Sequence, residues 1–236
     1  MGGALLGRWR AEDMGPVAVI DPALPGGDVL PDGRPDVMVL AVKPQVWREA
    51  VAPLADRMGP MTLVVSVMAG VTTDDLASVF SGSAIIRAMP NTPAGIGAGV
   101  TALFTTSGDL AEGAAEALFS AVGTTVWLSD ENDFDAVTAV SGSGPAYVFA
   151  FIEALAAAGE AAGLEAGLAA RLARETVTGA AALAAADASV SAADLRRRVT
   201  SPGGTTEAGL AVLVPGLVPL VVDTVAAAAA RSRQLR

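Results

Sequence analysis

The sequence predicts two parts of different fold class: an α/β N-terminal part built on a mostly parallel sheet, and an all-α C-terminal part. Two observations support this division. Up to about residue 130, short β-branched and apolar runs alternate with amphipathic stretches, the pattern of a parallel sheet with helices between its strands. From residue 131 the sequence is rich in alanine, with apolar residues at helical spacing. We therefore expect two domains, at 1–130 and 131–236.

In the N-terminal part, six short runs are expected to form strands that are apolar on both faces, as in a sheet covered on both sides. These runs are 16–20, 36–42, 61–67, 84–89, 99–104 and 124–128. Three amphipathic stretches are expected to form helices: 45–58, 72–80 and 109–123. The second of these begins with a threonine suited to an N-cap, Thr72 or Thr73, followed by acidic residues in its first turn.

The C-terminal part is expected to form four or five helices. Its stretch 209–230 is long enough to span a membrane, but Pro215, Gly216 and Pro219 interrupt it and Asp223 lies inside it. We therefore expect a pair of helices in a protein interface and no membrane span. The mean hydropathy of +0.51 indicates apolar faces that need a partner, which a tight homodimer through this part would supply.

Composition excludes several classes of function. The net charge of −10 argues against a nucleic-acid surface. There is no cysteine and no histidine, which excludes disulfides, thiolate nucleophiles, zinc sites on these residues and any triad with a histidine base. Chemistry must use hydroxyls, carboxylates, Tyr147, backbone amides, a cofactor or Lys43, which stands beside fourteen arginines as the single lysine. The N-terminus lacks the pattern of a signal peptide, so we expect a cytoplasmic protein and no metal.

The opening stretch "MGGALLGRW" fits the last part of a dinucleotide-binding turn. A Rossmann unit runs from a strand through a glycine turn to a helix whose N-terminus holds the pyrophosphate. Here the glycines and the helix are present without the strand, and an ordinary N-terminal helix is the alternative. We expect the first strand to be missing, with weak cofactor binding, poor stability and exposed edges on the neighbouring strands.

Three loops follow predicted strands and contain residues suited to a ligand. "AVKPQ" (41–45) carries the lysine and a proline typical of a first helical turn. "SVMAGVT" (66–72) and "RAMPNTPAGIGAGV" (87–100) bring small residues to strand ends, where a flat ligand can approach the backbone. Asn91 could hydrogen-bond a carboxamide. Ordinary connecting turns are the alternative for each loop taken by itself.

Two further motifs lie in the helical part. "SGSGPAY" (141–147) opens a long helix, with Ser141 and Ser143 as candidate caps. "TSPGGTTEAG" (200–209) places glycines and threonines at a helix start. The amides of residues 203–206, backed by a helix dipole, would form a nest for a carboxylate. A kinked turn between helices is the alternative.

Taken in order, "AVKPQ", "MAGV", "MPNTP", "SGSGPAY" and "SPGGTT" resemble the pyrroline-5-carboxylate reductase family. The resemblance covers essentially the whole chain. It implies a Rossmann-like domain that binds NADPH or NADH, and an all-helical domain that interlocks with its twin in a dimer, often assembled further into decamers. It places the active site between the cofactor domain and helices of the partner subunit. The implied reaction is hydride transfer to a cyclic imine carbon, giving L-proline, the last step of proline biosynthesis.

The resemblance also implies roles for individual residues. Thr206 would hydrogen-bond the ring nitrogen and donate a proton, directly or through a water. The amides of Gly204 and Thr205 would hold the substrate carboxylate, and Ser141 and Ser143 would shape the substrate side. The residues implied to line the cofactor are Gly2, Asp21, Ala41, Val42, Lys43, Pro44, Met68, Ala69, Gly70, Asn91 and Glu131, the last near the nicotinamide.

The sequence departs from the family's pattern at two places, and two alternative functions remain open. The chain begins at the "MG" of the family's fingerprint. Asp21, at the end of "PVAVI", is of the type that bonds ribose hydroxyls and repels a 2′-phosphate, which favours NADH in a family that generally prefers NADPH. A related hydroxyacid dehydrogenase would need a lysine on the long middle helix, and none occurs after Lys43. A non-catalytic dimeric remnant with impaired cofactor binding is the other alternative, against which the intact "SPGGTT" argues.

Overall fold

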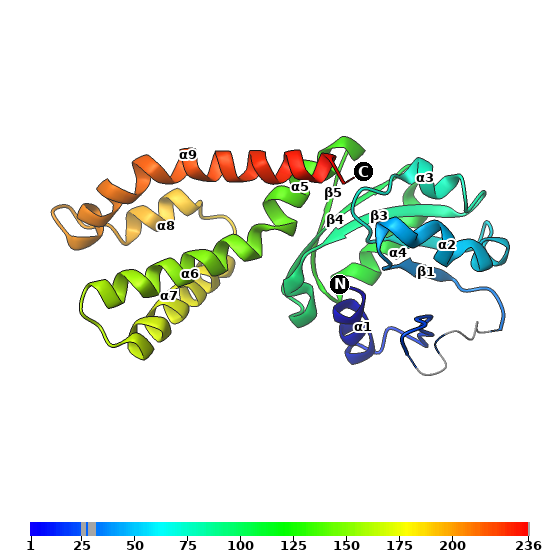
Figure 1. The fold of residues 1–236 in the computed structure, drawn as a ribbon, viewed down its shortest axis with the longest axis horizontal. Coiled ribbons are helices and arrows are strands. Elements are labelled where there is room, and N and C mark those ends of the chain that lie inside the picture. The colour runs from blue at the N-terminus through cyan, green and yellow to red at the C-terminus, as the bar shows by residue number, and fades with distance from the viewer. Residues whose placement is uncertain (25–26, 28–31, 236) are drawn as a thin grey trace. The chain divides into compact units, whose positions relative to one another are not determined.

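The computed structural model describes residues 1–24, 27 and 32–235 (Figure 1). The chain divides into two compact units: residues 1–143 together with the end of the chain from Ala228, and Gly144–Ala227. The first unit is α/β and the second is helical, so the predicted fold classes are confirmed. The domain boundary expected between residues 130 and 131 stays a prediction, and the two compact units divide between Ser143 and Gly144.

Among the described residues, five strands form one sheet in the order β1-β2-β3-β4-β5. Strands β1, β2 and β3 are parallel, β4 is antiparallel to β3, and β5 is parallel to β4. The mostly parallel sheet is therefore confirmed. The strand bounds are Val37–Leu40, Leu63–Ser66, Ala84–Pro90, Gly99–Thr105 and Gly123–Trp127.

Helices cover both faces of this sheet. On one face, α1 (Gly2–Ala11) and α4 (Asp109–Ser120) share a core that includes Leu5, Trp9 and Phe119. On the other face, α2 (Trp47–Val51) and α3 (Thr73–Ala77) share a second core. Strand β2 is consequently buried along its whole length. This explains why the central strands read as continuous apolar runs.

The expected strand at 16–20 is wrong. This stretch follows α1 as irregular chain, and its apolar side chains stay partly exposed: Val17 by 39% and Ile20 by 38%. A strand is stabilised by its ladder hydrogen bonds and by packing on its neighbours. Among the described residues the sheet ends at β1, which pairs with β2, and residues 16–20 add no strand beside it.

The helix expected at 45–58 is also interrupted. It consists of a 3-10 turn (Pro44–Val46), the short α2, and a second 3-10 segment (Ala52–Arg57). Pro53 lies at the start of the last segment and has no N–H to continue an α-helix. By contrast, α3 begins as predicted. Thr72 is its N-cap, and it forms a reciprocal capping box with Asp75.

The helical part begins with a short α5 (Phe134–Val137) and one π-helical turn (Thr138–Gly142). The longer helices are α6 (Gly144–Ala161), α7 (Ala166–Ala186), α8 (Ala192–Arg198) and α9 (Thr205–Arg233). Small residues let α6 and α7 approach closely. A side chain placed at Gly159 would meet the Cβ of Ala169 at 3.1 Å. The alanine-rich composition thus serves close helix packing.

The helix pair expected within 209–230 is wrong, because α9 is continuous with Pro215 and Pro219 inside it. Each proline removes one intrahelical hydrogen bond, but the turns on both sides continue the helix. Two helical stretches of the described chain, 131–161 and 205–233, are long and apolar enough to cross a membrane, with mean hydropathies of 1.2 and 2.1. They qualify by length and composition alone, a test that a core helix of a soluble protein also passes.

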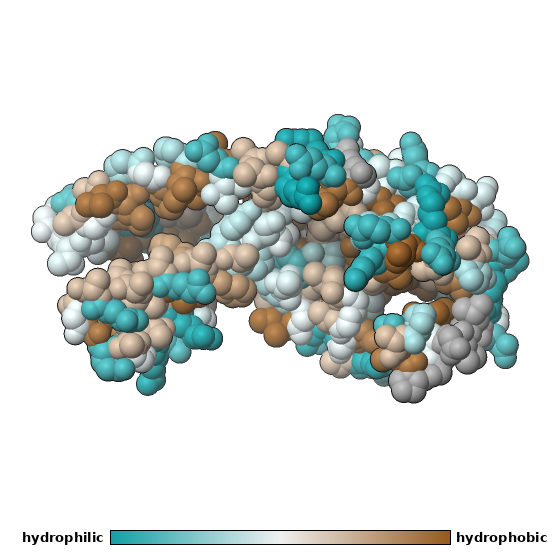
Figure 2. Space-filling view, in the orientation of Figure 1, coloured by the Kyte–Doolittle hydropathy of each residue, from teal (hydrophilic) through white to brown (hydrophobic). Residues whose placement is uncertain are grey.

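Many large apolar side chains of the second unit face outward. Figure 2 shows apolar side chains gathered along part of α9. The exposed fractions reach 60% for Phe149 on α6, and 82% and 65% for Val212 and Leu220 on α9. Apolar patches of this extent are typical of protein interfaces.

Candidate functional site

The N-terminus of α1 lies against the loop that follows β1. A Cβ built on Gly2 would meet the Cβ of Ala41 at 2.9 Å, so a larger residue at position 2 would force the two segments apart. The first N–H groups of a helix have no acceptor within the helix. Two residues implied to line a cofactor, distant in sequence, are therefore adjacent, and the helix end beside them carries free donors.

The loop after β1 leads directly into the next helix. Lys43 is exposed and extended, with φ −68° and ψ 136°, and Pro44 opens the 3-10 turn. A pocket of about 300 Å³ lies between this loop and the loop after β2. Its lining includes Pro44, Arg48, Gly70 and Asp75. Two of the three loops predicted to bind a ligand therefore border one hollow.

The loop after β2 is shaped by its glycine. Gly70 has φ +78°, a conformation that L side chains rarely adopt, so glycine is required there. The side chain of Met68 is 2% exposed and belongs to the core, so only the backbone of this residue could line a ligand. The N–H of Met68 donates to Ser66 Oγ at 3.3 Å, which ties the loop to the end of its strand.

Asn91 follows β3 and uses its side chain inside the first unit. Its Oδ1 accepts from the N–H of Val100 at 2.9 Å. Its Nδ2 donates toward Ser141, at 3.3 Å to the carbonyl oxygen and 3.4 Å to Oγ. The structure thus brings together two residues that the sequence assigned to different parts of the site. Asn91 is 8% exposed, which suits a residue that shapes the site.

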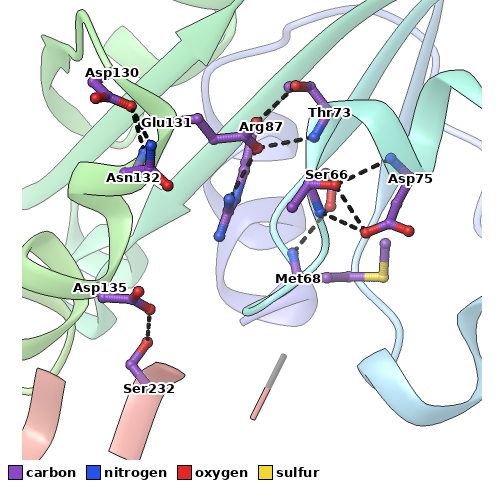
Figure 3. A network of polar contacts seen from close by, with 11 residues as sticks. Ser66, Met68, Thr73, Asp75, Arg87, Asp130, Glu131, Asn132, Asp135 and Ser232 are labelled. Atoms are coloured by element: carbon purple, nitrogen blue, oxygen red, sulfur yellow. Dashed lines mark hydrogen bonds and ion pairs between the residues drawn. The ribbon is translucent and has the colours of Figure 1, made fainter. Parts of the chain in front are cut away.

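Glu131 accepts three hydrogen bonds from within the protein (Figure 3). Oε1 accepts from the N–H of Thr73 and from Arg87 Nη1, both at 2.9 Å, and Oε2 accepts from Thr73 Oγ1 at 2.8 Å. The guanidinium of Arg87 also lies 4.1 Å from the centre of the Phe134 ring. Sequence reasoning missed Arg87. The signal was a single cation within the apolar run "AIIRAM".

The carboxylate of Asp21 caps its own turn. Oδ1 accepts from the N–H of Ala23 at 3.0 Å, and the residue is exposed. An exposed carboxylate with one backbone partner within the described part of the chain keeps lone pairs available for another donor. Its predicted role toward a ribose stays a prediction.

Asp75 stands at the edge of the pocket between the loops. Burial opposes its ionisation, but hydrogen bonds from Thr72 and the guanidinium of Arg48 together lower its pKa below the usual value. Asp75 Oδ1 accepts from Arg48 Nη2 at 2.9 Å. This carboxylate is therefore ionised at neutral pH and fixes the start of α3.

In the second unit, the nest expected at residues 203–206 is partly occupied by the protein itself. The N–H of Gly203, whose φ is +70°, donates to Glu207 Oε2 at 2.7 Å. The N–H of Gly204 donates to the carbonyl oxygen of Ser201 at 3.0 Å. Thr205 and Thr206 are exposed and form the first turn of α9, where N–H groups have no acceptor within the helix. The free donors of this nest are therefore those of the two threonines.

Glu207 is a second residue that sequence reasoning missed. It lies in the first turn of α9, where a carboxylate is favoured by the helix dipole. The signal was a glutamate in the first turn of the helix expected after "SPGG". The N–H of Ser143 donates to the carbonyl oxygen of Thr138 at 2.8 Å and closes the π-helical turn of the first unit.

Comparison with known proteins places this geometry in a family. Residues 131–235 match the family model described as pyrroline-5-carboxylate reductase dimerisation. The pyrroline-5-carboxylate reductase of Synechocystis is 47% identical over 205 residues, which cover 85% of this chain and 75% of that protein. Solved structures agree with the sequence match.

The pyrroline-5-carboxylate reductase of Coxiella burnetii superposes with a TM-score of 0.80 and 41% identity, over 85% of this chain and 76% of that one. The pyrroline carboxylate reductase of Plasmodium falciparum, solved with NADP bound, superposes with a TM-score of 0.83 and 26% identity, over 100% of this chain and 94% of that one. With this identity and coverage, the chain belongs to the pyrroline-5-carboxylate reductase family.

Proposed function

We propose that this chain reduces 1-pyrroline-5-carboxylate to L-proline with NADPH or NADH, the last step of proline biosynthesis. The observation that carries the proposal is 47% identity to a named pyrroline-5-carboxylate reductase over most of the chain. A hydride adds to the imine carbon, which becomes C5 of proline, a proton adds to the ring nitrogen, and the C=N bond becomes a single bond. The absence of histidine and cysteine is no obstacle, because the cofactor supplies the hydride when bound.

In the first unit, the residues fit a dinucleotide at the carboxyl ends of β1 and β2. The close approach of Gly2 to Ala41 leaves no room for a side chain where the backbone of α1 would face a pyrophosphate. The backbone from Ala41 to Pro44 and from Met68 to Gly70 would line the cofactor. The bound NADP of the Plasmodium falciparum relative supports this class of cofactor.

Glu131 fits the site as a support for other residues. Both of its oxygens are already engaged, so we assign it a role in holding the first unit together beside the nicotinamide. We assign Asn91 to the same task, because its carboxamide links β4 to Ser141. Asp21 remains the candidate for the ribose hydroxyls.

In the second unit, the start of α9 fits the substrate. A carboxylate would accept from the free amides of Thr205 and Thr206, and the helix dipole would stabilise its charge. The amide of Gly204 contributes less than the motif suggests, since it already bonds Ser201. We assign the hydroxyl of Thr206 to the ring nitrogen, as donor or as one end of a water relay, and Ser141 and Ser143 to the substrate side.

We also propose a cytoplasmic homodimer that assembles further, up to a decamer. The match to a dimerisation model over 131–235 and the exposed Phe149, Val212 and Leu220 support a partner on the helical unit. Light scattering after size exclusion would test this, with a monomer contradicting it.

The function is tested by following loss of NADPH or NADH together with formation of L-proline. We expect equal amounts of cofactor consumed and proline formed.

Thr206→Ala should lower kcat by about a hundredfold, the lower end for loss of a general acid. The cofactor KM should stay within about twofold, because Thr206 lies in the other unit. Thr206→Ser keeps the hydroxyl and is the matched control, and unchanged kcat in Thr206→Ala would remove Thr206 from the mechanism.

A further inference from the structure

Arg87 is a fully buried cation in the middle of the sheet. Its side chain is 2% exposed, and it lies on β3 in register with Ser66, the last residue of β2. Its Nη1 pairs with Glu131, while its Nε is buried without a hydrogen-bond partner among the described residues. Burying a charge is costly even when it is paired, so packing and stability by themselves would favour an apolar residue here.

The ion pair connects β3 to the beginning of α3. Glu131 bonds both the N–H and the hydroxyl of Thr73, the first residue of α3 (Figure 3). Nη1 of Arg87 donates to Oε1 of Glu131 at 2.9 Å. The guanidinium of Arg87 also lies over the ring of Phe134, which follows Glu131 closely in the sequence. The buried guanidinium of Arg87 therefore adds, through Glu131, to the packing of Leu76 that holds α3 against the sheet.

The loop between β2 and α3 is held at its second end by this pair of residues. Its first end, Ser66, lies beside Arg87 in the parallel ladder, where the backbones of β2 and β3 set the register. Its second end is the capped start of α3, where Thr73 is bound by Glu131. Between them lie residues 68–70, which the proposed function assigns to the cofactor, and Gly70 holds the loop in a turn with φ +78°.

We propose that Arg87 is a positioning residue for NADPH or NADH: through Glu131 it holds the loop 68–70 in the shape that receives the nicotinamide half of the cofactor. The proposal rests on the proposed function for the assignment of that loop. It also explains why both carboxylate oxygens of Glu131 accept hydrogen bonds from within the protein. Arg87 itself touches neither cofactor nor substrate, because its side chain is enclosed by the protein.

The test measures cofactor binding without substrate, by titrating NADPH and following its fluorescence. Arg87→Met removes the charge and keeps most of the volume. We expect the Kd for NADPH to rise about tenfold, in the range for residues that act on a site through others. Arg87→Lys keeps a cation beside Glu131 but loses the planar contact with Phe134, so we expect a smaller rise in Kd than in Arg87→Met. Glu116→Gln is the matched control, because Glu116 accepts one exposed hydrogen bond from Trp127 elsewhere in the same unit.

Steady-state kinetics separate positioning from a merely structural role. Arg87→Met should raise the KM for the cofactor about tenfold and the KM for the imine less than about twofold. If Arg87→Met does not fold, Thr73→Ala replaces it, because it removes one donor to Glu131 and leaves the ion pair intact. Thr73→Ala should raise the Kd about threefold, the effect of one hydrogen bond.

An unchanged Kd in a folded Arg87→Met or Thr73→Ala variant would overturn the proposal, and so would an equal rise in Glu116→Gln. If the original chain binds NADPH but forms no proline, the proposed function fails while the positioning role stands. If the original chain binds no NADPH, the positioning role falls.

Discussion

Replacing Glu131 with alanine should lower the free energy of unfolding by about 3 kcal/mol, the lower end of the range for breaking a buried ion pair. The main cause is Arg87, which is 2% exposed and would keep its charge without a partner. The change also leaves the N–H and hydroxyl of Thr73 without their acceptor. The lower end applies because the Glu131 side chain is 21% exposed, so water can enter the vacated space.

Urea unfolding followed by circular dichroism, at one fixed protein concentration, measures this loss. Glu116→Ala is the control and should cost less than about 1 kcal/mol, because it removes one exposed hydrogen bond. Adding Arg87→Met to Glu131→Ala should restore part of the stability, since no unpaired buried charge would remain. A loss below about 1 kcal/mol in Glu131→Ala would refute the reasoning from buried charge.

Three further predictions concern other parts of the molecule. Asp21→Ser should shift the preference from NADH toward NADPH, because a 2′-phosphate is no longer repelled; an unaltered ratio of the two kcat/KM values would show that Asp21 points elsewhere. Thr72→Ala should cost about 1 kcal/mol at neutral pH through loss of the α3 cap. The pKa of Asp75 is lowered by folding, so its contribution is present above the unfolded pKa of about 3.9 and is lost as the pH falls through the folded value. The gap between the unfolding midpoints of Thr72→Ala and the original chain should therefore narrow in acid, and a constant gap would contradict the capping box. Phe149→Asp should weaken the dimer, seen as a lower mass in light scattering, while an unchanged mass would place the interface elsewhere.

Sequence patterns predicted the elements that depend on local rules. Apolar runs located the strands β1 to β5. The start of α3 was narrowed to Thr72 or Thr73, and the N-cap is Thr72, whose side chain accepts from a backbone N–H three residues away. The change to helical spacing marked the second fold class. These features are decided within a few residues, so a single sequence contains them.

The predictions failed where contacts between residues distant in the sequence determine the local structure. The run 16–20 has the composition of a strand but lacks a ladder beside β1. The prolines 215 and 219 are common helix breakers, yet α9 continues through them because its other turns remain bonded. Pairs 44 and 58 residues apart in sequence, Arg87 with Glu131 and Thr73 with Glu131, could not be read from spacing. The hydrogen bonds that already occupy the amides of Gly203 and Gly204 could likewise not be predicted, because they depend on the geometry of the turn.

The central claim is hydride transfer from a nicotinamide to the imine carbon. It is tested by incubating the chain with pyrroline-5-carboxylate and NADPH that carries deuterium at both C4 positions. We predict L-proline with one deuterium at C5. Proline formed without deuterium, or no proline from a chain that binds NADPH, would contradict the claim.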